Sequence, residues 1–116
     1  MNSAELKQRT KTFAHSCVKL AHELPNNAAG KHLAGQLIRS STSVAANYRS
    51  ACLAQSKKSF AAKISIVLEE ADESHFWIEF ISDEKLLENN QLRKLLKEAD
   101  ELTRIFAASR KTSQSA

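Results

Sequence analysis

Four stretches of the chain, each about 20 residues long, repeat apolar side chains in alternating steps of four and three. The first of these seams begins at Leu6 and ends at Leu24. Such steps place a single stripe of side chains on one face of an α-helix and are typical of helices that pack together. No stretch alternates with the period of two expected of a β-strand. The sequence therefore predicts an all-α protein. Its expected helices cover about residues 4–24, 31–53, 57–83 and 90–109, followed by a frayed tail over residues 110–116.

Short polar breaks separate the predicted helices. Pro25 ends the first helix, because the residue before a proline is pushed out of the helical conformation. Ser56 can cap the third helix, and Asn89 or Asn90 the fourth. Helices joined by such short connections pack beside their neighbours in antiparallel order. We therefore expect one domain over residues 1–116, an antiparallel up-down-up-down four-helix bundle.

The sequence has no mark of a secreted or membrane protein. No apolar run approaches the roughly 20 residues that cross a bilayer, and the N-terminal residues lack the apolar segment of a secretory signal. Cys17 and Cys52 fall within predicted helices, and we interpret them as reduced, buried thiols of a cytoplasmic protein. The alternative, a disulfide between the first two helices, would require an oxidising compartment.

Polar residues on the second helix indicate how it pairs with the third. If the two helices fold back around Gln55, facing residues have numbers that sum to about 110, and Arg39 lies between Glu70 and Glu73. We predict that Arg39, Asn47, Glu70 and Glu73 form a structural polar cluster that fixes the register. Asn47 needs a partner there, since an unpaired buried amide costs about 1–3 kcal/mol. A catalytic carboxylate pair is the alternative, but the sequence shows no accompanying nucleophile or metal ligands.

Three aromatic residues widen the apolar surface near the end of the third helix. Phe76, Trp77 and Phe80 extend it beyond the arc that a single neighbouring helix would cover. We predict that they form a subunit interface in a homo-oligomer. The alternative is that the first or fourth helix covers them within one chain.

Positive charge is concentrated in the first half of the chain. Residues 1–63 hold ten Lys and Arg and two acidic residues, whereas residues 64–116 hold seven and eleven. One interpretation of this asymmetry is that oppositely charged faces of two copies contact each other. Another is that the basic half binds the phosphate backbone of a nucleic acid without recognising its bases. Mutual neutralisation between packed helices, which would leave only a solvated helix end, is the alternative. The predicted nucleic-acid-binding residues are Arg49, Lys57, Lys58 and Lys63.

The sequence contains no recognisable catalytic or metal-binding pattern. His15 and His22 are seven residues apart, unlike the pair at i and i+4 of a zinc-binding helix. The spacing from Arg9 to His15 formally matches helical-bundle ribonucleases of the HEPN type, but such a match arises easily by chance among many basic residues. We therefore expect a non-enzymatic protein without metal or cofactor, with a HEPN-like ribonuclease as a remote alternative.

Three runs of residues resemble a known family of helical bundles. The likeness extends from about Phe13 to Ser109 and is specific in the two middle helices. The runs are Gln36-Leu37-x-Arg39-Ser40-x-x-Ser43-Val44-x-Ala46-Asn47-Tyr48-Arg49, Ser56-x-x-x-Phe60-x-x-Lys63, and Glu69-Glu70-Ala71-Asp72-Glu73-x-x-x-Trp77. They resemble the four-helix bundle proteins encoded in intervening sequences of bacterial 23S rRNA genes, a family formerly labelled S23 ribosomal protein. Many relatives carry Ala-Glu-Gly after the asparagine, where this chain has Tyr48-Arg49-Ser50.

The resemblance implies a left-handed bundle that assembles into a ring-like homopentamer, in a family whose molecular function is poorly established. More distantly, the chain is similar to accessory variability proteins of retroelements, which form pentameric barrels and bind nucleic acid and a reverse transcriptase. We therefore hypothesise a homo-oligomer that binds nucleic acid, RNA rather than DNA, through a repeated basic surface. The alternative is a protein-interaction scaffold without nucleic-acid binding. Neither hypothesis involves a membrane.

Overall fold

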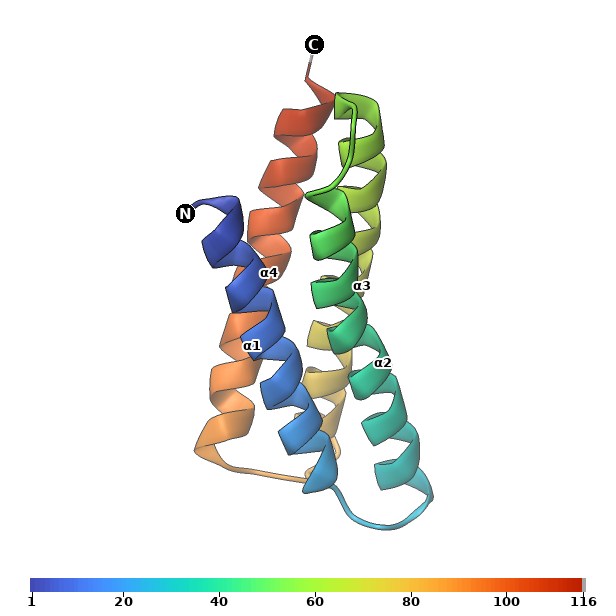
Figure 1. Ribbon diagram of the computed structural model, residues 1–116. Coiled ribbons are helices and arrows are strands. Elements are labelled where there is room, and N and C mark those ends of the chain that lie inside the picture. The colour runs from blue at the N-terminus through green and yellow to red at the C-terminus, as the bar shows by residue number, and fades with distance from the viewer. Residues whose placement is uncertain (116) are drawn as a thin grey trace.

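The structure, a computed structural model, describes residues 1–115 and consists of four α-helices. These are α1 (Ser3–His22), α2 (Ala28–Ala51), α3 (Lys57–Asp83) and α4 (Asn90–Gln114). The helices run alternately in opposite directions, and α1 closes the bundle against α4 (Figure 1). Within the described residues, α1 and α3 lie diagonally, and no Cα atom of one comes within 8 Å of a Cα atom of the other. The prediction of an all-α, antiparallel four-helix bundle is confirmed.

The same local interaction starts all four helices. A side-chain oxygen just before the helix accepts a hydrogen bond from the backbone N–H three residues later, at 2.8–3.0 Å. This bond satisfies one of the N–H groups that have no partner within the helix. The capping residues are Asn2, Asn27, Ser56 and Asn89.

The second helix begins earlier than expected. It starts at Ala28 rather than at residue 31, because Asn27 caps it and Gly30 lies inside its first turn. Gly30 is buried, and a Cβ at this position would overlap with the carbonyl group of Pro25. The glycine therefore permits the close approach of loop and helix, and does not mark a helix boundary.

The ends of the other helices also differ in part from expectation. α1 ends at His22, two residues before Leu24, because its last turn closes onto Glu23 ahead of Pro25. α4 continues to Gln114, so most of the predicted frayed tail is helical. Ala116 lies outside the described residues.

A left-handed residue ends α3 at its predicted boundary. Lys85 has a φ of 55°, and the N–H of Leu86 donates to the carbonyl of Ile81 at 3.2 Å. This is the Schellman arrangement that closes many helices. Leu86 and Leu87 therefore lie in the loop, where both pack against the core.

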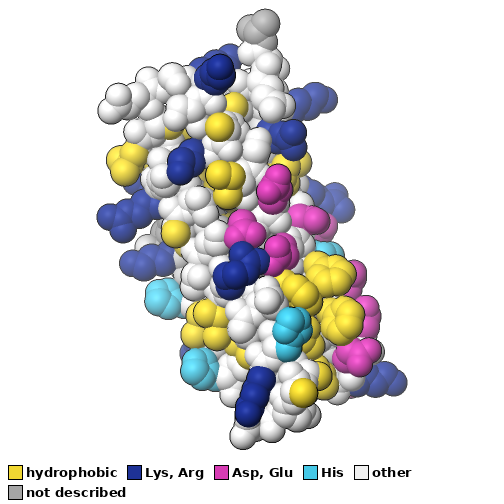
Figure 2. Space-filling model, turned by 90° about the vertical axis from the view of Figure 1, so that its right-hand side faces the viewer, with side chains coloured by type: hydrophobic (Ala, Val, Ile, Leu, Met, Phe, Trp, Pro, Cys, Tyr) yellow, Lys and Arg dark blue, Asp and Glu magenta, His cyan; other side chains and the backbone are white. Residues whose placement is uncertain are grey.

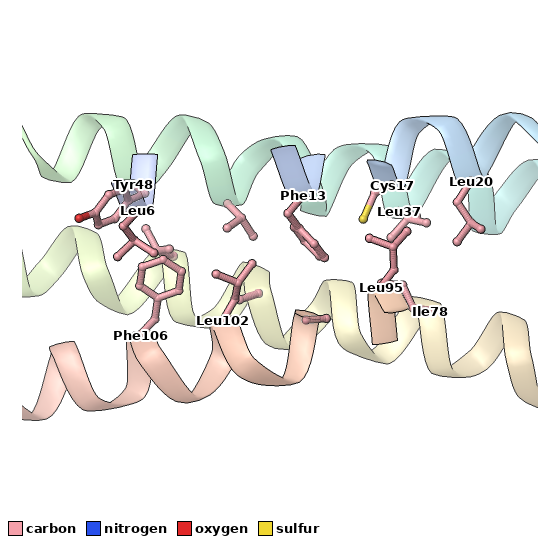
Figure 3. Packing of buried hydrophobic residues seen from close by; sticks show 14 of the residues in the cluster. Leu6, Phe13, Cys17, Leu20, Leu37, Tyr48, Ile78, Leu95, Leu102 and Phe106 are labelled. Carbon is pink, nitrogen blue, oxygen red and sulfur yellow. The ribbon is translucent and has the colours of Figure 1, made fainter. Parts of the chain in front are cut away.

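The core runs along the whole bundle axis. Apolar side chains from all four helices meet there (Figure 3). On α2 the next buried side chain after Val44 is Tyr48, whereas Asn47, which we expected to be buried, is only half-buried. The reason is that a straight helix repeats every 3.6 residues and drifts away from a strict seven-residue pattern. The ring of Tyr48 packs on Phe106, with 5.4 Å between the ring centroids.

The bundle is a narrow rod with extents of 47 × 21 × 20 Å. Over the described residues, no helix combines the length and the apolar character that crossing a bilayer requires.

Candidate functional site

The topology collects positive charge at the end of the bundle where both chain termini lie (Figure 1). Three segments form this end: residues 1–11, 49–63 and 100–115. Together they hold ten of the 17 Lys and Arg residues but only three of the 13 acidic residues. We call this region the basic end. Its Lys and Arg residues are Lys7, Arg9, Lys11, Arg49, Lys57, Lys58, Lys63, Arg104, Arg110 and Lys111.

The four predicted nucleic-acid-binding residues all lie at the basic end, but they do not form one cluster. Arg49 lines a groove between α1 and α2 together with Lys7 and Lys11. Lys63 lines a separate depression at the α2–α3 turn, beside Gln55. Lys57 and Lys58 are exposed on the first turn of α3.

The first turn of α3 concentrates positive charge. It contains Lys57 and Lys58 and no acidic residue. The helix dipole is also positive at this terminus, so acidic residues would stabilise it and lysines do not. The Nζ of Lys57 donates to the backbone carbonyl of Ser115 at 2.8 Å, which holds the end of the chain beside this turn. Such a surface attracts anions, including phosphate.

The structural polar cluster brings together three of its four predicted members. Arg39 Nη1 lies 3.0 Å from Glu70 Oε2, and Arg39 Nη2 donates to Glu73. Glu73 also accepts a hydrogen bond from Trp77 Nε1 at 3.0 Å. Asn47 does not join this cluster, because its Nδ2 donates instead to the carbonyl and hydroxyl oxygens of Ser43 on its own helix.

A hydrogen bond beneath the cluster explains why α2 and α3 can approach closely. The buried hydroxyl groups of Ser40 and Ser74 face each other at 2.9 Å. Each serine has a small side chain, and their mutual bond satisfies both polar groups in the core.

A second arginine cluster joins α1 to α4. The guanidinium of Arg9 donates to both carboxylate oxygens of Glu98, each at 2.7 Å, and to Glu101 at 3.1 Å. The hydrogen bond to Glu98 raises the pKa of Arg9. The sequence did not predict this contact. The available signal was the pair of glutamates three residues apart on the seam edge of the last helix.

The structure separates Arg9 from His15, the pair expected of a HEPN-like ribonuclease. Arg9 faces α4, where two carboxylates hold it, whereas His15 lines the groove between α1 and α2. Over residues 1–115 there is also no group of three or more His, Cys, Asp or Glu side chains placed to hold a metal ion.

The two cysteines have different environments. Cys17 is fully buried, and burial raises the pKa of its thiol to about 12, which keeps it protonated. Cys52 is only half-buried, in contrast to the prediction of two buried thiols, because it lies at the capping position where α2 ends. Both cysteines are free, and no disulfide links the first two helices within the described residues.

The three predicted interface aromatics also divide into two groups. Trp77 packs against the core and meets the ring of His32 edge-on, with centroids 5.8 Å apart. Phe76 and Phe80 are 49% and 40% exposed, and their rings lie 5.8 Å apart. Figure 2 shows hydrophobic side chains gathered at the lower right of this face, with acidic side chains along the adjoining edge. Only Phe76 and Phe80 therefore present a large aromatic surface to solvent.

Comparisons with known proteins agree on one relationship. A family model described as 23S rRNA-intervening sequence protein matches residues 2–108. Among solved structures, the chain is similar to a protein of unknown function from the S23 ribosomal protein family of Bacteroides thetaiotaomicron VPI-5482. The TM-score is 0.82 at 30% sequence identity, and the match covers 90% of this chain and 97% of the other. No curated protein matches the sequence.

Proposed function

The chain belongs to the 23S rRNA-intervening sequence protein family, and from this premise we propose that it is a non-enzymatic homo-oligomer, a pentamer, that binds RNA. Its basic end contacts the phosphate backbone. The observation that carries the proposal is the concentration of ten Lys and Arg residues against three acidic residues at that end. The description of the family names 23S rRNA, and this favours RNA as the nucleic acid.

The chemistry of the basic end suits backbone contact without base recognition. Arg9 and Arg104 pair with acidic residues, but the other lysines and arginines there are mostly exposed and can neutralise phosphates, releasing the counterions that accompany them. The exposed aromatic rings lie toward the other end of α3, away from this surface. Stacking on single-stranded bases therefore has no support at the basic end.

The contacts of Arg9 support a non-enzymatic role over a HEPN-like ribonuclease. Two carboxylates neutralise its guanidinium, so it is not free to stabilise a charged phosphate intermediate. RNA binding is then a matter of repeated weak contacts, and assembly into a ring would multiply them.

The test measures the affinity for a labelled single-stranded RNA over a series of salt concentrations. The slope of log affinity against log salt is negative, and each lost phosphate contact reduces its magnitude by about 0.7 for a single strand. The double variant Lys57→Ala/Lys58→Ala should therefore make the slope shallower by about 1.4. The matched control is Lys94→Ala/Lys97→Ala, which removes two exposed lysines from the first half of α4, outside the basic end, and should leave the slope unchanged. Absence of RNA binding at low salt, or equal slopes for the two variants, would contradict the proposal.

A further inference from the structure

A groove of about 570 Å³ runs along the outer side of the bundle between α1 and α2. Small side chains form much of its floor, including Ala14, Ala45 and Ala46. A short side chain leaves the space between two helices unfilled, so these alanines create the hollow. The groove is open to solvent and predominantly apolar.

Basic side chains border this apolar floor. Lys7, Lys11 and Arg49 line the groove, and no acidic residue does. Within residues 1–115, none of the three forms a salt bridge. The groove therefore combines an apolar floor with unpaired positive charge.

The exposed face of α3 has the complementary character. Apolar and acidic residues share this face, and the chain has no Lys or Arg from residue 64 to residue 84. Ile66, Phe76 and Phe80 are each at least 40% exposed. We call this face the α3 stripe; its exposed apolar and acidic members are Ile66, Glu69, Asp72, Phe76, Glu79, Phe80 and Asp83.

We propose that the groove between α1 and α2 receives the α3 stripe of a second copy of this chain. An amphipathic helix commonly binds by laying its apolar face in a groove. Here the apolar residues of the stripe would cover the alanine floor, while its carboxylates meet Lys7, Lys11 and Arg49 at the border. Charge complementarity of this kind fixes the partner and the register.

The two surfaces also match in length. The apolar residues of the stripe, from Ile66 to Phe80, and the α1 wall of the groove, from Ala4 to Val18, each extend over 14 helical steps. At 1.5 Å per residue, each is about 21 Å long. The docked helix therefore fills the groove from end to end.

The contact must form between chains. The stripe lies on α3 and the groove on the side of α1 and α2, and within the described residues no Cα atom of α1 lies within 8 Å of a Cα atom of α3. Each copy thus offers one groove and one stripe, and the contact is head-to-tail. Such contacts generate a closed ring when the rotation between copies closes, and a filament when it does not.

This docking rests on the proposed homo-oligomer and divides the basic residues by role. Lys7, Lys11 and Arg49 would serve assembly, whereas Lys57 and Lys58 remain exposed for RNA. Arg49 therefore changes role relative to the sequence-based prediction.

The test combines two variants of exposed residues, whose helical content is checked by circular dichroism. Lys7→Glu/Lys11→Glu reverses the charge of the groove, and Phe76→Ser/Phe80→Ser removes the aromatic part of the stripe. Each variant alone should be a monomer by light scattering at a concentration where the wild type is assembled. Mixed in equal amounts, they should form a dimer and nothing larger, because only one intact groove and one intact stripe remain. The matched control, Lys94→Glu/Lys97→Glu on α4, should keep the wild-type mass.

The outcomes separate this docking from the proposed function. An assembled wild type whose mass is unchanged in both variants, or a mixture that stays monomeric, overturns the docking alone. A monomeric wild type overturns the homo-oligomer as well. A groove variant that keeps its mass and loses RNA affinity would assign the groove to nucleic acid and also overturn the docking.

Discussion

Two seams of the bundle use the same arrangement of charges and differ in what surrounds it. Arg39 on α2 lies between Glu70 and Glu73 of α3, and Arg9 on α1 lies between Glu98 and Glu101 of α4. In both seams one arginine bridges two glutamates three residues apart.

The α2–α3 seam has other interactions that fix its register. A short turn connects the two helices, and Ser40 and Ser74 bond in the core below the charges. The α1–α4 seam joins the two ends of the chain and packs less extensively. Its arginine is also more sheltered, with a side chain 29% exposed compared with 49% for Arg39. The arginine–glutamate contacts should therefore contribute more to stability in the α1–α4 seam, where packing contributes less, than in the α2–α3 seam.

The largest expected effect is a loss of stability at high pH, which arises because the thiol of Cys17 is buried in the core beside α1. The pKa of Cys17 rises from 9.0 in the unfolded chain to about 12 in the fold. The unfolded state then loses its proton first, so stability is fully present below pH 9 and falls as pH rises towards 12, by about 4 kcal/mol in total. Urea unfolding of the wild type and Cys17→Ala should show a shallower pH dependence for the variant between pH 9 and 10. Cys52→Ala serves as the control, and equal slopes for wild type and Cys17→Ala would contradict the assignment.

Overfilling the α2–α3 seam should have the next largest effect. Ser74→Leu places a longer side chain against Ser40, where the helices are too close for it, and should destabilise the protein by about 2 kcal/mol. Ser74→Ala is the matched control and should cost less than about 1 kcal/mol, because Ser40 is close enough to the Leu37 carbonyl to bond it instead. If Ser74→Leu and Ser74→Ala destabilise the protein equally, close packing between α2 and α3 does not stabilise this seam.

Removing each arginine compares the two seams directly. Arg9→Ala should destabilise the protein by about 1–2 kcal/mol, since two charge-assisted bonds to Glu98 are lost in a sheltered site. Arg39→Ala should cost less than about 1 kcal/mol, as expected of a more exposed ion pair. Urea unfolding of both variants gives the ranking, and the reverse order would refute the difference between the seams.

The smallest effect is the coupling within the Arg39 cluster. Arg39→Glu places three like charges together, and adding Glu73→Arg should recover about 0.5–1 kcal/mol. The control adds Glu69→Arg instead, at an exposed position beside the cluster, and should recover less. If Glu73→Arg gives no more recovery than Glu69→Arg, Arg39 does not interact with Glu73 in solution.

The contrast between the seams also shows how far sequence reasoning could go. Arg39 could be placed between Glu70 and Glu73 because a short turn fixes which residues of α2 and α3 face each other. No turn connects α1 with α4, so the sequence offers no register for Arg9 and Glu98. The fold class, in contrast, follows from the seams of the individual helices.

Surface features were harder to predict for a different reason. Four alanines line the groove, and a hollow made by small side chains leaves no chemical pattern in the sequence. Trp77 and Phe80 lie about 60° apart around the α3 axis, and this difference decides that Trp77 packs inward while Phe80, like Phe76, faces solvent. The heptad pattern alone does not resolve such an angle.

The rod shape and the charge at one end make the molecule an electric dipole. Its long axis of 47 Å is several times the screening length of about 8 Å at physiological ionic strength. A polyanion close to the basic end is therefore attracted by the positive charge there, and the repulsion from the acidic surface farther along the rod is screened. The rod should turn its basic end towards the polyanion before contact, so that added salt slows association more than it hastens release.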